Sequence, residues 1–482
     1  MSKFKSLDAY LPKENTGYEI LPFKFERLGG DVFVSNLVGE FKFLSEKDFQ
    51  DFTAYNINPI SELYSDLQSK HLLIERGSSI SLELLALKLR TKLKRLSSFT
   101  ALHLFVVSLR CEHSCPYCQV SRQSDNKVAF DMTQEIADKA LDLTFQSPSS
   151  AIKIEFQGGE PLLNFPIIKY IVQSALEINK AKKKNLAFVI ATNLAVISDE
   201  MLEFCKHYSI DISTSLDGPK DLHNSNRPRK GNNSYELTIA GIEKARNFLG
   251  VDHVSALMTT TKSSLGQVRD IIDEYVLQNF GGIFLRPLSP YGFAVKTKWY
   301  NSYGVDDWLK FYFEGLDYII ELNRNGLKFQ EFYARMILTK MLTPYQTGYV
   351  DMMSPAGTGI AAVVYNYDGD VFASDESRML AEMGDKTFCL GNVLTDSYKT
   401  IFTNDVLLEA IESSFTGSAP MCSDCAFEPY CGSDPVYHHT TQGDFVGKKW
   451  NSGFCDRNLT IFRKLVQYYR NPEIRNIFES WV

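Results

Sequence analysis

The sequence predicts an α/β fold built around a partial (β/α)6 barrel, with a small domain before it and a cysteine-rich domain after it. Apolar runs alternate with amphipathic helical stretches across residues 101–287, a pattern typical of parallel sheets. Short alternating runs punctuated by glycine precede this region, and four clustered cysteines follow it. The length of 482 residues is consistent with about three domains.

Composition is that of an ordinary globular protein. Hydrophobic residues make up 44% and the net charge is −7, which argues against nucleic acid as the main partner. Residues 1–16 lack the apolar segment of a signal peptide, and no run reaches the roughly 18 apolar residues of a membrane span. Seven of the nine cysteines have ligand-like spacing, which favours metal sites over disulfides. We expect a cytoplasmic protein without a membrane partner.

Residues 1–95 are predicted to form an N-terminal domain and its linker helix. Three short segments predict a β-meander, two amphipathic stretches predict helices and a basic run predicts the linker helix: residues 23–27, 31–36 and 40–44, then 45–55 and 61–73, then 88–95. This order resembles the winged-helix-like peptide-recognition domain of ribosomal-peptide maturases, which is similar to the peptide chaperone of the PQQ system. The resemblance implies that the leader of a precursor peptide adds a strand to the sheet edge. A simple cap over the barrel is the alternative.

Residues 96–290 are predicted to form the barrel. Six strand candidates alternate with helical stretches; the strands are 102–109, 152–156, 187–191, 210–215, 254–259 and 282–285, and the helices are 134–145, 167–182, 200–208, 235–248 and 268–280. In such folds the chemistry lies at the C-terminal ends of the strands. The residues that follow each strand are therefore the candidates for a site.

The loop after the first strand reads R-C-E-H-S-C-P-Y-C. Thiolates of Cys111, Cys115 and Cys118 can hold three irons of a cubane cluster and leave the fourth iron open, whereas zinc would need a fourth ligand in local register. The motif resembles the signature of the radical S-adenosylmethionine (SAM) superfamily. That resemblance implies a [4Fe–4S] cluster whose open iron binds SAM and whose electron yields a 5′-deoxyadenosyl radical. Three unrelated buried thiols are the alternative.

Polar motifs follow the next three strands. Gly158-Gly159-Glu160 is similar to the superfamily's G-G-E-P motif, which takes the methionine amino group, and glycines permit a close backbone approach. After the later strands, the resemblance implies that a polar residue meets the SAM ribose and an arginine meets its carboxylate. The predicted cofactor-binding residues are Tyr117, Gly158, Gly159, Glu160, Asn193, Ser215, Asp217 and Arg227.

Residues 291–350 are predicted to be a helical bridge, with helices at 306–323 and 329–342, and residues 351–482 a C-terminal domain that begins with a hairpin at 361–373. Its cysteine spacing resembles the SPASM domain, which usually carries two auxiliary [4Fe–4S] clusters. Ser354, Ser374 and Pro435 stand where that family has cysteines of one cluster. We therefore expect one auxiliary [4Fe–4S] cluster, with a zinc site as the alternative, held by Cys422, Cys425, Cys431 and Cys455.

An acidic pair follows the hairpin. In the sulfatase-maturing branch, an aspartate in the equivalent slot takes the proton from the substrate. The resemblance therefore implies that Asp375 is a general base near the substrate, with Glu376 as a substitute. A solvent-exposed carboxylate at a hairpin end is the alternative.

The order of the parts resembles the His-Xaa-Ser system radical SAM maturases of the B type, as do the local motifs at residues 21–23, 38–41, 374–379 and 431–435. The resemblance implies oxidation or side-chain cross-linking of a precursor peptide. It also implies a second radical SAM maturase as partner and a flavodoxin or ferredoxin as electron donor. Two alternatives remain: an anaerobic sulfatase maturase-like formylglycine-generating enzyme, and a catalytically silent peptide-binding scaffold.

Overall fold

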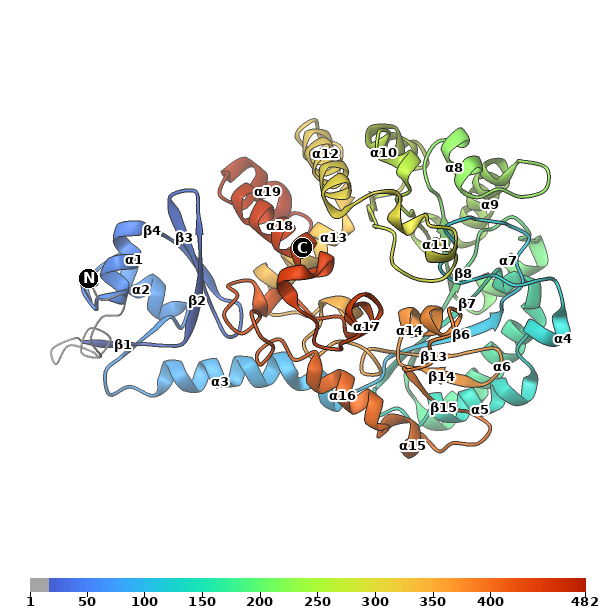
Figure 1. Ribbon diagram of the computed structural model, residues 1–482, viewed down its shortest axis with the longest axis horizontal. Coiled ribbons are helices and arrows are strands. Elements are labelled where there is room, and N and C mark those ends of the chain that lie inside the picture. Colours follow the sequence, from blue (N-terminus) through green and yellow to red (C-terminus); the bar gives the residue numbers. More distant parts are fainter. Residues whose placement is uncertain (1–16) are drawn as a thin grey trace.

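The computed structural model describes residues 17–482, so the prediction that no signal segment precedes the domain lies outside the described residues. The N-terminal domain lies at one end of the molecule, the barrel at the other, and the helices that close the chain lie between them (Figure 1). Among the described residues, none of the helices is both long enough and apolar enough to cross a membrane.

The predicted meander of the N-terminal domain is confirmed. Strands β2 (Phe23–Leu28), β3 (Asp31–Asn36) and β4 (Phe41–Ser45) form an antiparallel sheet in that order. Helices α1 (Glu46–Thr53) and α2 (Glu62–Ser69) follow, and serine side chains before each accept a backbone N–H of its first turn, which satisfies donors that the helix leaves free.

The second predicted helix is too long at its C-terminal end. His71 takes a left-handed conformation with φ 52°, which ends the helix. Leu73 therefore lies in strand β5 (Leu73–Glu75), which pairs antiparallel with β1 (Tyr18–Ile20). The linker helix α3 (Ile80–Leu93) then runs toward the barrel.

The N-terminal domain is anchored on the loop that carries the auxiliary cysteines. Phe33 stacks on Phe427 with ring centroids 5.3 Å apart. Ser35 Oγ donates to the Ala426 carbonyl at 2.6 Å, and Lys24 pairs with Glu428 at 2.9 Å. These apolar and polar contacts fix the sheet against residues almost 400 positions away in the chain.

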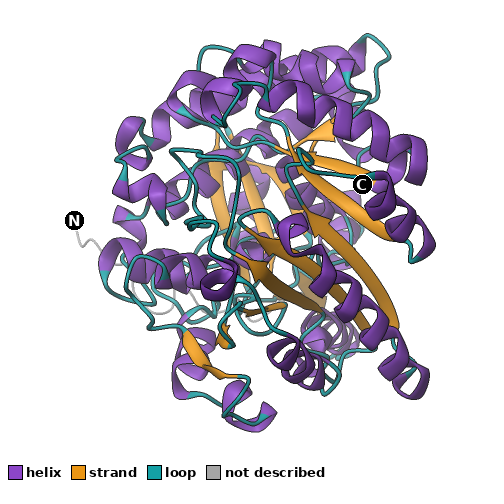
Figure 2. Ribbon diagram, turned by 90° about the vertical axis from the view of Figure 1, so that its right-hand side faces the viewer, coloured by secondary structure: helices purple, strands orange, loops and turns teal. Residues whose placement is uncertain are grey.

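Five parallel strands form the hydrogen-bonded part of the barrel, in the order β10-β9-β8-β7-β6. Their helices cover the outside of the curved sheet (Figure 2), as right-handed βαβ crossovers require. The strands are β6 (Leu102–Ser108), β7 (Ala151–Gly158), β8 (Asn185–Ala191), β9 (Ile210–Ser215) and β10 (Val254–Leu257), and the helices are α5 (Gln134–Thr144), α6 (Phe165–Lys182), α7 (Asp199–His207), α9 (Ser234–Leu249) and α10 (Val268–Leu277).

The sixth predicted strand forms but leaves the main sheet. It is the short β11 (Gly282–Ile283), which pairs with β12 (Gln330–Glu331) rather than with β10. Buried Glu331 of β12 also holds the segment after β11, because its carboxylate accepts the backbone N–H of Leu285 at 3.2 Å. The chain nevertheless returns to the barrel end, where Thr260 N donates to Arg286 O at 2.9 Å.

The predicted C-terminal hairpin is present and extends the barrel sheet, which the sequence did not predict. Strand β13 (Ala362–Tyr365) pairs parallel with β6, and β14 (Asp370–Phe372) and β15 (Cys389–Asn392) add antiparallel strands. The hairpin therefore places the segment after β14 beside the barrel sheet. The principal helices of this half are α12 (Val305–Arg324), α13 (Phe332–Leu342), α14 (Asp375–Ala381), α15 (Tyr398–Phe402), α16 (Asp405–Ser413), α17 (Pro435–Gln442), α18 (Gly453–Tyr469) and α19 (Pro472–Glu479).

Candidate active site

Cys111, Cys115 and Cys118 line one cavity of about 230 Å³ at the C-terminal ends of the barrel strands. The base of their loop is held by Arg110, whose Nε lies 2.7 Å from Asp131 Oδ1. None of the three thiols forms a disulfide. The structure thus presents three free thiols to a shared cavity, as the spacing predicted.

Gly158 and Gly159 bring the end of β7 against the cysteine loop. A Cβ at Gly158 would lie 1.9 Å from the Ser108 carbonyl oxygen, and a Cβ at Gly159 would lie 2.4 Å from that of Arg110. Because side chains are sterically excluded at both positions, the backbone itself forms the cavity wall. That is the close approach predicted for a bound methionine moiety.

Arg227 lines the same cavity, and Asp217 and Tyr117 hold its guanidinium in position. Its Nε lies 3.1 Å from Asp217 Oδ2, and its guanidinium lies over the Tyr117 ring at 5.7 Å. The Tyr117 hydroxyl also donates to Asp217. Burial alone would lower the pKa of Arg227, but the Asp217 carboxylate raises it, so the guanidinium stays charged.

Asn193 and Ser215 complete the cavity wall, from the ends of neighbouring strands. Asn193 Nδ2 donates to Glu112 Oε1 at 2.9 Å and lies 3.0 Å from His113 Nδ1. The amide is thereby tied to the cysteine loop. Every strand-end motif predicted from the sequence therefore contributes at least one residue to this cavity.

Two predicted cofactor contacts do not line it. Glu160 is buried, and its carboxylate accepts hydrogen bonds from Leu162 N, Thr192 Oγ1 and Asn193 N. Asp217 is directed at Arg227 and Tyr117 as described. Burial, together with the nearby Glu112 carboxylate, raises the pKa of Glu160 to about 8. In this structure both carboxylates position their neighbours and do not face the cavity.

The donor set fits a [4Fe–4S] cluster with SAM on its open iron. Burial raises the pKa of the Cys115 thiol to about 12, so a cationic group is needed to hold it as a thiolate. Three thiols on one loop match three irons. The exposed backbone of the two glycines and the charged Arg227 suit the polar end of an amino acid.

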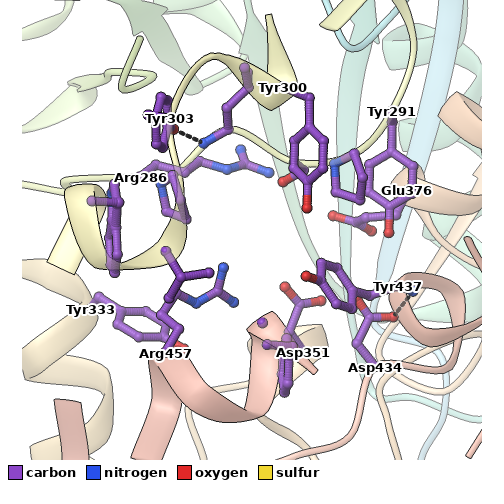
Figure 3. A pocket seen from close by; sticks show the side chains of 18 of the residues that line it. Arg286, Tyr291, Tyr300, Tyr303, Tyr333, Asp351, Glu376, Asp434, Tyr437 and Arg457 are labelled. Atoms are coloured by element: carbon purple, nitrogen blue, oxygen red, sulfur yellow. Dashed lines mark hydrogen bonds between the residues drawn. The ribbon is translucent and has the colours of Figure 1, made fainter. Parts of the chain in front are cut away.

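A second cavity, of about 180 Å³, adjoins the first; we call it the chamber (Figure 3). Arg286 lines both cavities. The ionisable side chains of the chamber wall come from the barrel end, the helical bridge, the segment after this bridge and three helices of the C-terminal domain. The charged residues and tyrosines that line it are Arg286, Tyr291, Tyr300, Tyr303, Tyr333, Tyr349, Asp351, Glu376, Asp434, Tyr437 and Arg457.

The two predicted catalytic carboxylates lie where the cavities meet. Asp375 lines the first cavity and Glu376 lines the chamber. Ser374 caps their helix by accepting the Ser377 N–H at 3.2 Å, which fixes both residues in the first turn of α14. Burial raises the pKa of Glu376 to about 7, with Asp351 and Asp375 as further causes.

Reasoning from sequence missed four charged residues of the chamber: Arg286, Asp351, Asp434 and Arg457. Arg286 could have been found, because it follows the sixth strand candidate just as the other motifs follow theirs. The other three come from separate segments, and although Asp434 lies in the motif at residues 431–435, nothing in the sequence links it with Asp351 and Arg457. Only the packing of the C-terminal helices on the barrel brings them together.

The four auxiliary cysteines also share a cavity, of about 320 Å³. Cys422, Cys425 and Cys431 lie on the loop before α17, and Cys455 lies near the start of α18. The three positions where the SPASM family has cysteines of a second cluster have other structural roles in this chain. Ser354 Oγ accepts from Thr416 N, Ser374 caps α14 and Pro435 begins α17.

Comparison with known proteins agrees with this geometry. Residues 105–274 match the family described as the Radical SAM superfamily. An uncharacterized protein of Methanothermobacter thermautotrophicus is 32% identical over 193 residues, which are 39% of this chain and 69% of that protein. The cysteine-type anaerobic sulfatase-maturating enzyme of Clostridium perfringens is 25% identical over 67% of this chain and 84% of its own length.

Solved structures show the same fold. Native anSMEcpe with bound AdoMet superimposes with a TM-score of 0.64 at 18% identity, over 79% of this chain and all of that one. Streptococcus suis SuiB, solved with its precursor peptide SuiA, gives a TM-score of 0.51 at 14% identity, over 89% of this chain and 98% of that one. The cysteine loop, the glycine pair, the strand-end residues and these similarities agree, and the chain belongs to the radical SAM superfamily.

Proposed function

We propose that this enzyme installs a radical-mediated modification, an oxidation or a side-chain cross-link, on a ribosomally made precursor peptide. The observation that carries the proposal is the junction of two cavities at Arg286. The first cavity contains the three thiols and most of the residues predicted to bind SAM. The second cavity, the chamber, is lined by polar residues and contains no SAM-binding motif. A substrate side chain in the chamber would face the first cavity across this junction.

When bound, the reduced [4Fe–4S] cluster and SAM supply a 5′-deoxyadenosyl radical. The chain's own residues do the rest. Gly158, Gly159, Asn193, Ser215 and Arg227 would orient SAM, and the chamber would hold the substrate so that one C–H bond lies within reach. Positioning of this kind converts a reactive radical into a selective one.

Asp375 is our candidate for the proton acceptor once the substrate radical has been oxidised, with Glu376 as a substitute. One Asp375 carboxylate oxygen, Oδ1, is buried and accepts no hydrogen bond among the described residues. Its nearest cation contact is Arg378 Nε at 3.6 Å. A general base needs an oxygen beside the substrate that can accept a proton.

The cavity of Cys422, Cys425, Cys431 and Cys455 would hold one auxiliary [4Fe–4S] cluster. Four thiols close the coordination of a cluster, which suits electron transfer or structure. Tetrahedral zinc remains the alternative. Iron analysis separates the two, because two clusters require roughly eight irons per chain and one cluster with zinc requires roughly four.

The N-terminal sheet would bind the precursor leader by strand addition. SuiB, which shares the fold over 89% of this chain, was solved with its precursor peptide SuiA, and this supports a peptide substrate. The proposal also includes a second radical SAM maturase as partner, a flavodoxin or ferredoxin as electron donor and a cytoplasmic location.

The decisive test is the intact mass of a precursor peptide encoded beside this protein, after co-expression. We expect a loss of about two hydrogens, as oxidation or cross-linking requires, and no loss with Cys111→Ala. An unchanged mass together with no 5′-deoxyadenosine after reduction with SAM would support a silent scaffold instead.

A formylglycine-generating activity is the second candidate, because the sulfatase-maturating relative matches over 84% of its length. A peptide with a single cysteine distinguishes the two activities. Its conversion to formylglycine replaces sulfur by oxygen and removes two hydrogens, which lowers the mass by about 18 Da, whereas a cross-link or a desaturation lowers it by about 2 Da.

A further inference from the structure

The chamber contains more negative than positive ionisable groups. Asp351, Glu376 and Asp434 line it with Arg286 and Arg457. Three carboxylates against two guanidiniums leave one unbalanced negative charge when all five groups are ionised. Figure 3 shows the two arginines on one side of the open space and the three carboxylates on the other.

These charges face one another without direct pairing. No ion pair joins either arginine to any of the three carboxylates in the part of the chain that the structure describes. Burial, together with a neighbouring carboxylate, raises the pKa of Asp351 and of Asp434 to about 7. A cation bound in the chamber would offset this excess negative charge.

Aromatic rings form much of the remaining wall. Tyr333, Tyr349 and Tyr437 line the chamber, and aromatic faces attract cations. Trp308 and Phe454 also line it, and the Arg457 guanidinium lies over both of these rings. An acidic cluster framed by aromatic rings is a combination that favours an ammonium, guanidinium or imidazolium group.

Two buried donors point to what accompanies that cation. The Tyr291 hydroxyl and Trp308 Nε1 are buried and have no hydrogen-bond partner among the described residues, and both side chains line the chamber. Buried donors are normally satisfied. Carbonyl oxygens of a peptide backbone would satisfy them, whereas a free metal cation would not.

We infer that the chamber binds one basic side chain of the substrate peptide, with Asp351, Glu376 and Asp434 supplying the countercharge and the aromatic rings the frame. This inference rests on the proposed function and specifies its substrate class. Arg286 and Arg457 then limit the chamber to a single positive charge. Asp351 and Arg457 are its specificity-determining residues.

The test measures binding alone, so it does not depend on turnover. Reconstituted holoenzyme with SAM is titrated with the N-acetyl methylamides of lysine, arginine and histidine. The norleucine derivative is the uncharged control for lysine, and the glutamate derivative is the anionic control. Saturation-transfer NMR gives each Kd. We expect at least one basic probe to bind at least about tenfold more tightly than both controls.

Two variants must act in opposite directions. Asp351→Asn removes the unbalanced charge and should reduce the preference for the basic probe to below about threefold, whereas Arg457→Met adds a second unbalanced charge and should increase it. Asp306→Asn makes the same chemical change on exposed Asp306 of α12 and should leave the preference unchanged. Equal binding of basic and norleucine probes, tighter binding of the glutamate probe, or a change of the same sign in both chamber variants would overturn the inference. Formation of 5′-deoxyadenosine, assayed separately, reports on the proposed function.

Discussion

The two groups of thiols use the same chemistry in different surroundings. Cys111, Cys115 and Cys118 share their cavity with Gly158, Gly159, Asn193 and Arg227, groups suited to a polar ligand. The cavity of Cys422, Cys425, Cys431 and Cys455 also contains buried Lys449, whose Nζ donates to Ser433 Oγ at 2.7 Å. The first site thus offers three thiols and a place for a ligand, and the second offers four thiols and a buried cation.

The number of thiols decides what each site can do. A three-thiol cluster keeps an iron for SAM, while a four-thiol cluster is coordinatively closed. An auxiliary [4Fe–4S] cluster at the second site would carry net negative charge, which Lys449 would offset. We therefore expect loss of a thiol from the first site to stop SAM cleavage. Loss of a thiol from the second site should leave SAM cleavage intact but reduce peptide modification.

The largest expected effect is that of Cys115→Ala. We expect 5′-deoxyadenosine formation to fall at least about 100-fold, because the cluster that binds SAM is lost. The iron content should fall by roughly four per chain. Cys389→Ala, at a cysteine outside both cavities, is the control and should keep iron and activity. Retained SAM cleavage in Cys115→Ala would mean that these thiols do not hold the reactive cluster.

Cys455→Ala tests whether the second group of thiols acts separately from the first. We expect peptide modification to fall at least about tenfold, while 5′-deoxyadenosine formation stays within about threefold of the wild type. The ratio of the two products in one reaction is the measurement, so the variant serves as its own control. A parallel fall in both products would show that the two sites are one functional unit.

Arg227→Lys weakens the ligand side of the first site. Lysine cannot reproduce the fork that a guanidinium offers to a carboxylate, and we expect the Kd of SAM to rise about tenfold, or roughly 1.4 kcal/mol. Equilibrium dialysis with labelled SAM measures it. Arg229→Lys is the matched control, since Arg229 pairs with Asn233 Oδ1 instead. Equal changes in the two variants would remove the assigned role of Arg227.

The smallest effect is expected from Lys449→Met. Burial lowers the pKa of Lys449, and the thiols of Cys422, Cys455 and Cys431 counteract this. Loss of its positive charge should lower the reduction potential of the auxiliary cluster by an amount on the order of tens of millivolts. Redox titration followed by EPR measures the shift. Lys448→Met should not change the potential, and a redox-silent site in the wild type would favour zinc.

Residues at strand ends were predictable because parallel strands align their C-terminal ends at one edge. This rule groups Cys111, Asn193, Ser215 and Arg227 from the sequence alone, and all four line the first cavity. The rule does not tell a ligand contact from a supporting residue. Glu160 was predicted as a SAM contact, yet it hydrogen-bonds within the protein, because a motif specifies which residue is present but not the direction of its side chain.

Long-range packing could not be predicted from the sequence. The turn at Asp368-Gly369 predicted a hairpin, but a turn carries no information about which sheet its strands join. The pairing of β13 with β6 and the convergence of Asp351, Asp434 and Arg457 are both decided by tertiary contacts between distant segments. The sequence therefore did not show that these residues share a chamber with Arg286 and Glu376.

The pairing of β13 with β6 has a consequence for biosynthesis. His103 in β6 is paired with Val363. During translation, β6 is therefore synthesised about 260 residues before the strand that covers its edge. At translation rates of roughly 5–20 residues per second, this interval lasts about 10–50 s. During it, β6 is an uncovered strand edge that other chains can pair with. We expect the nascent barrel to need chaperone protection, and slow synthesis before residue 365 to favour aggregation.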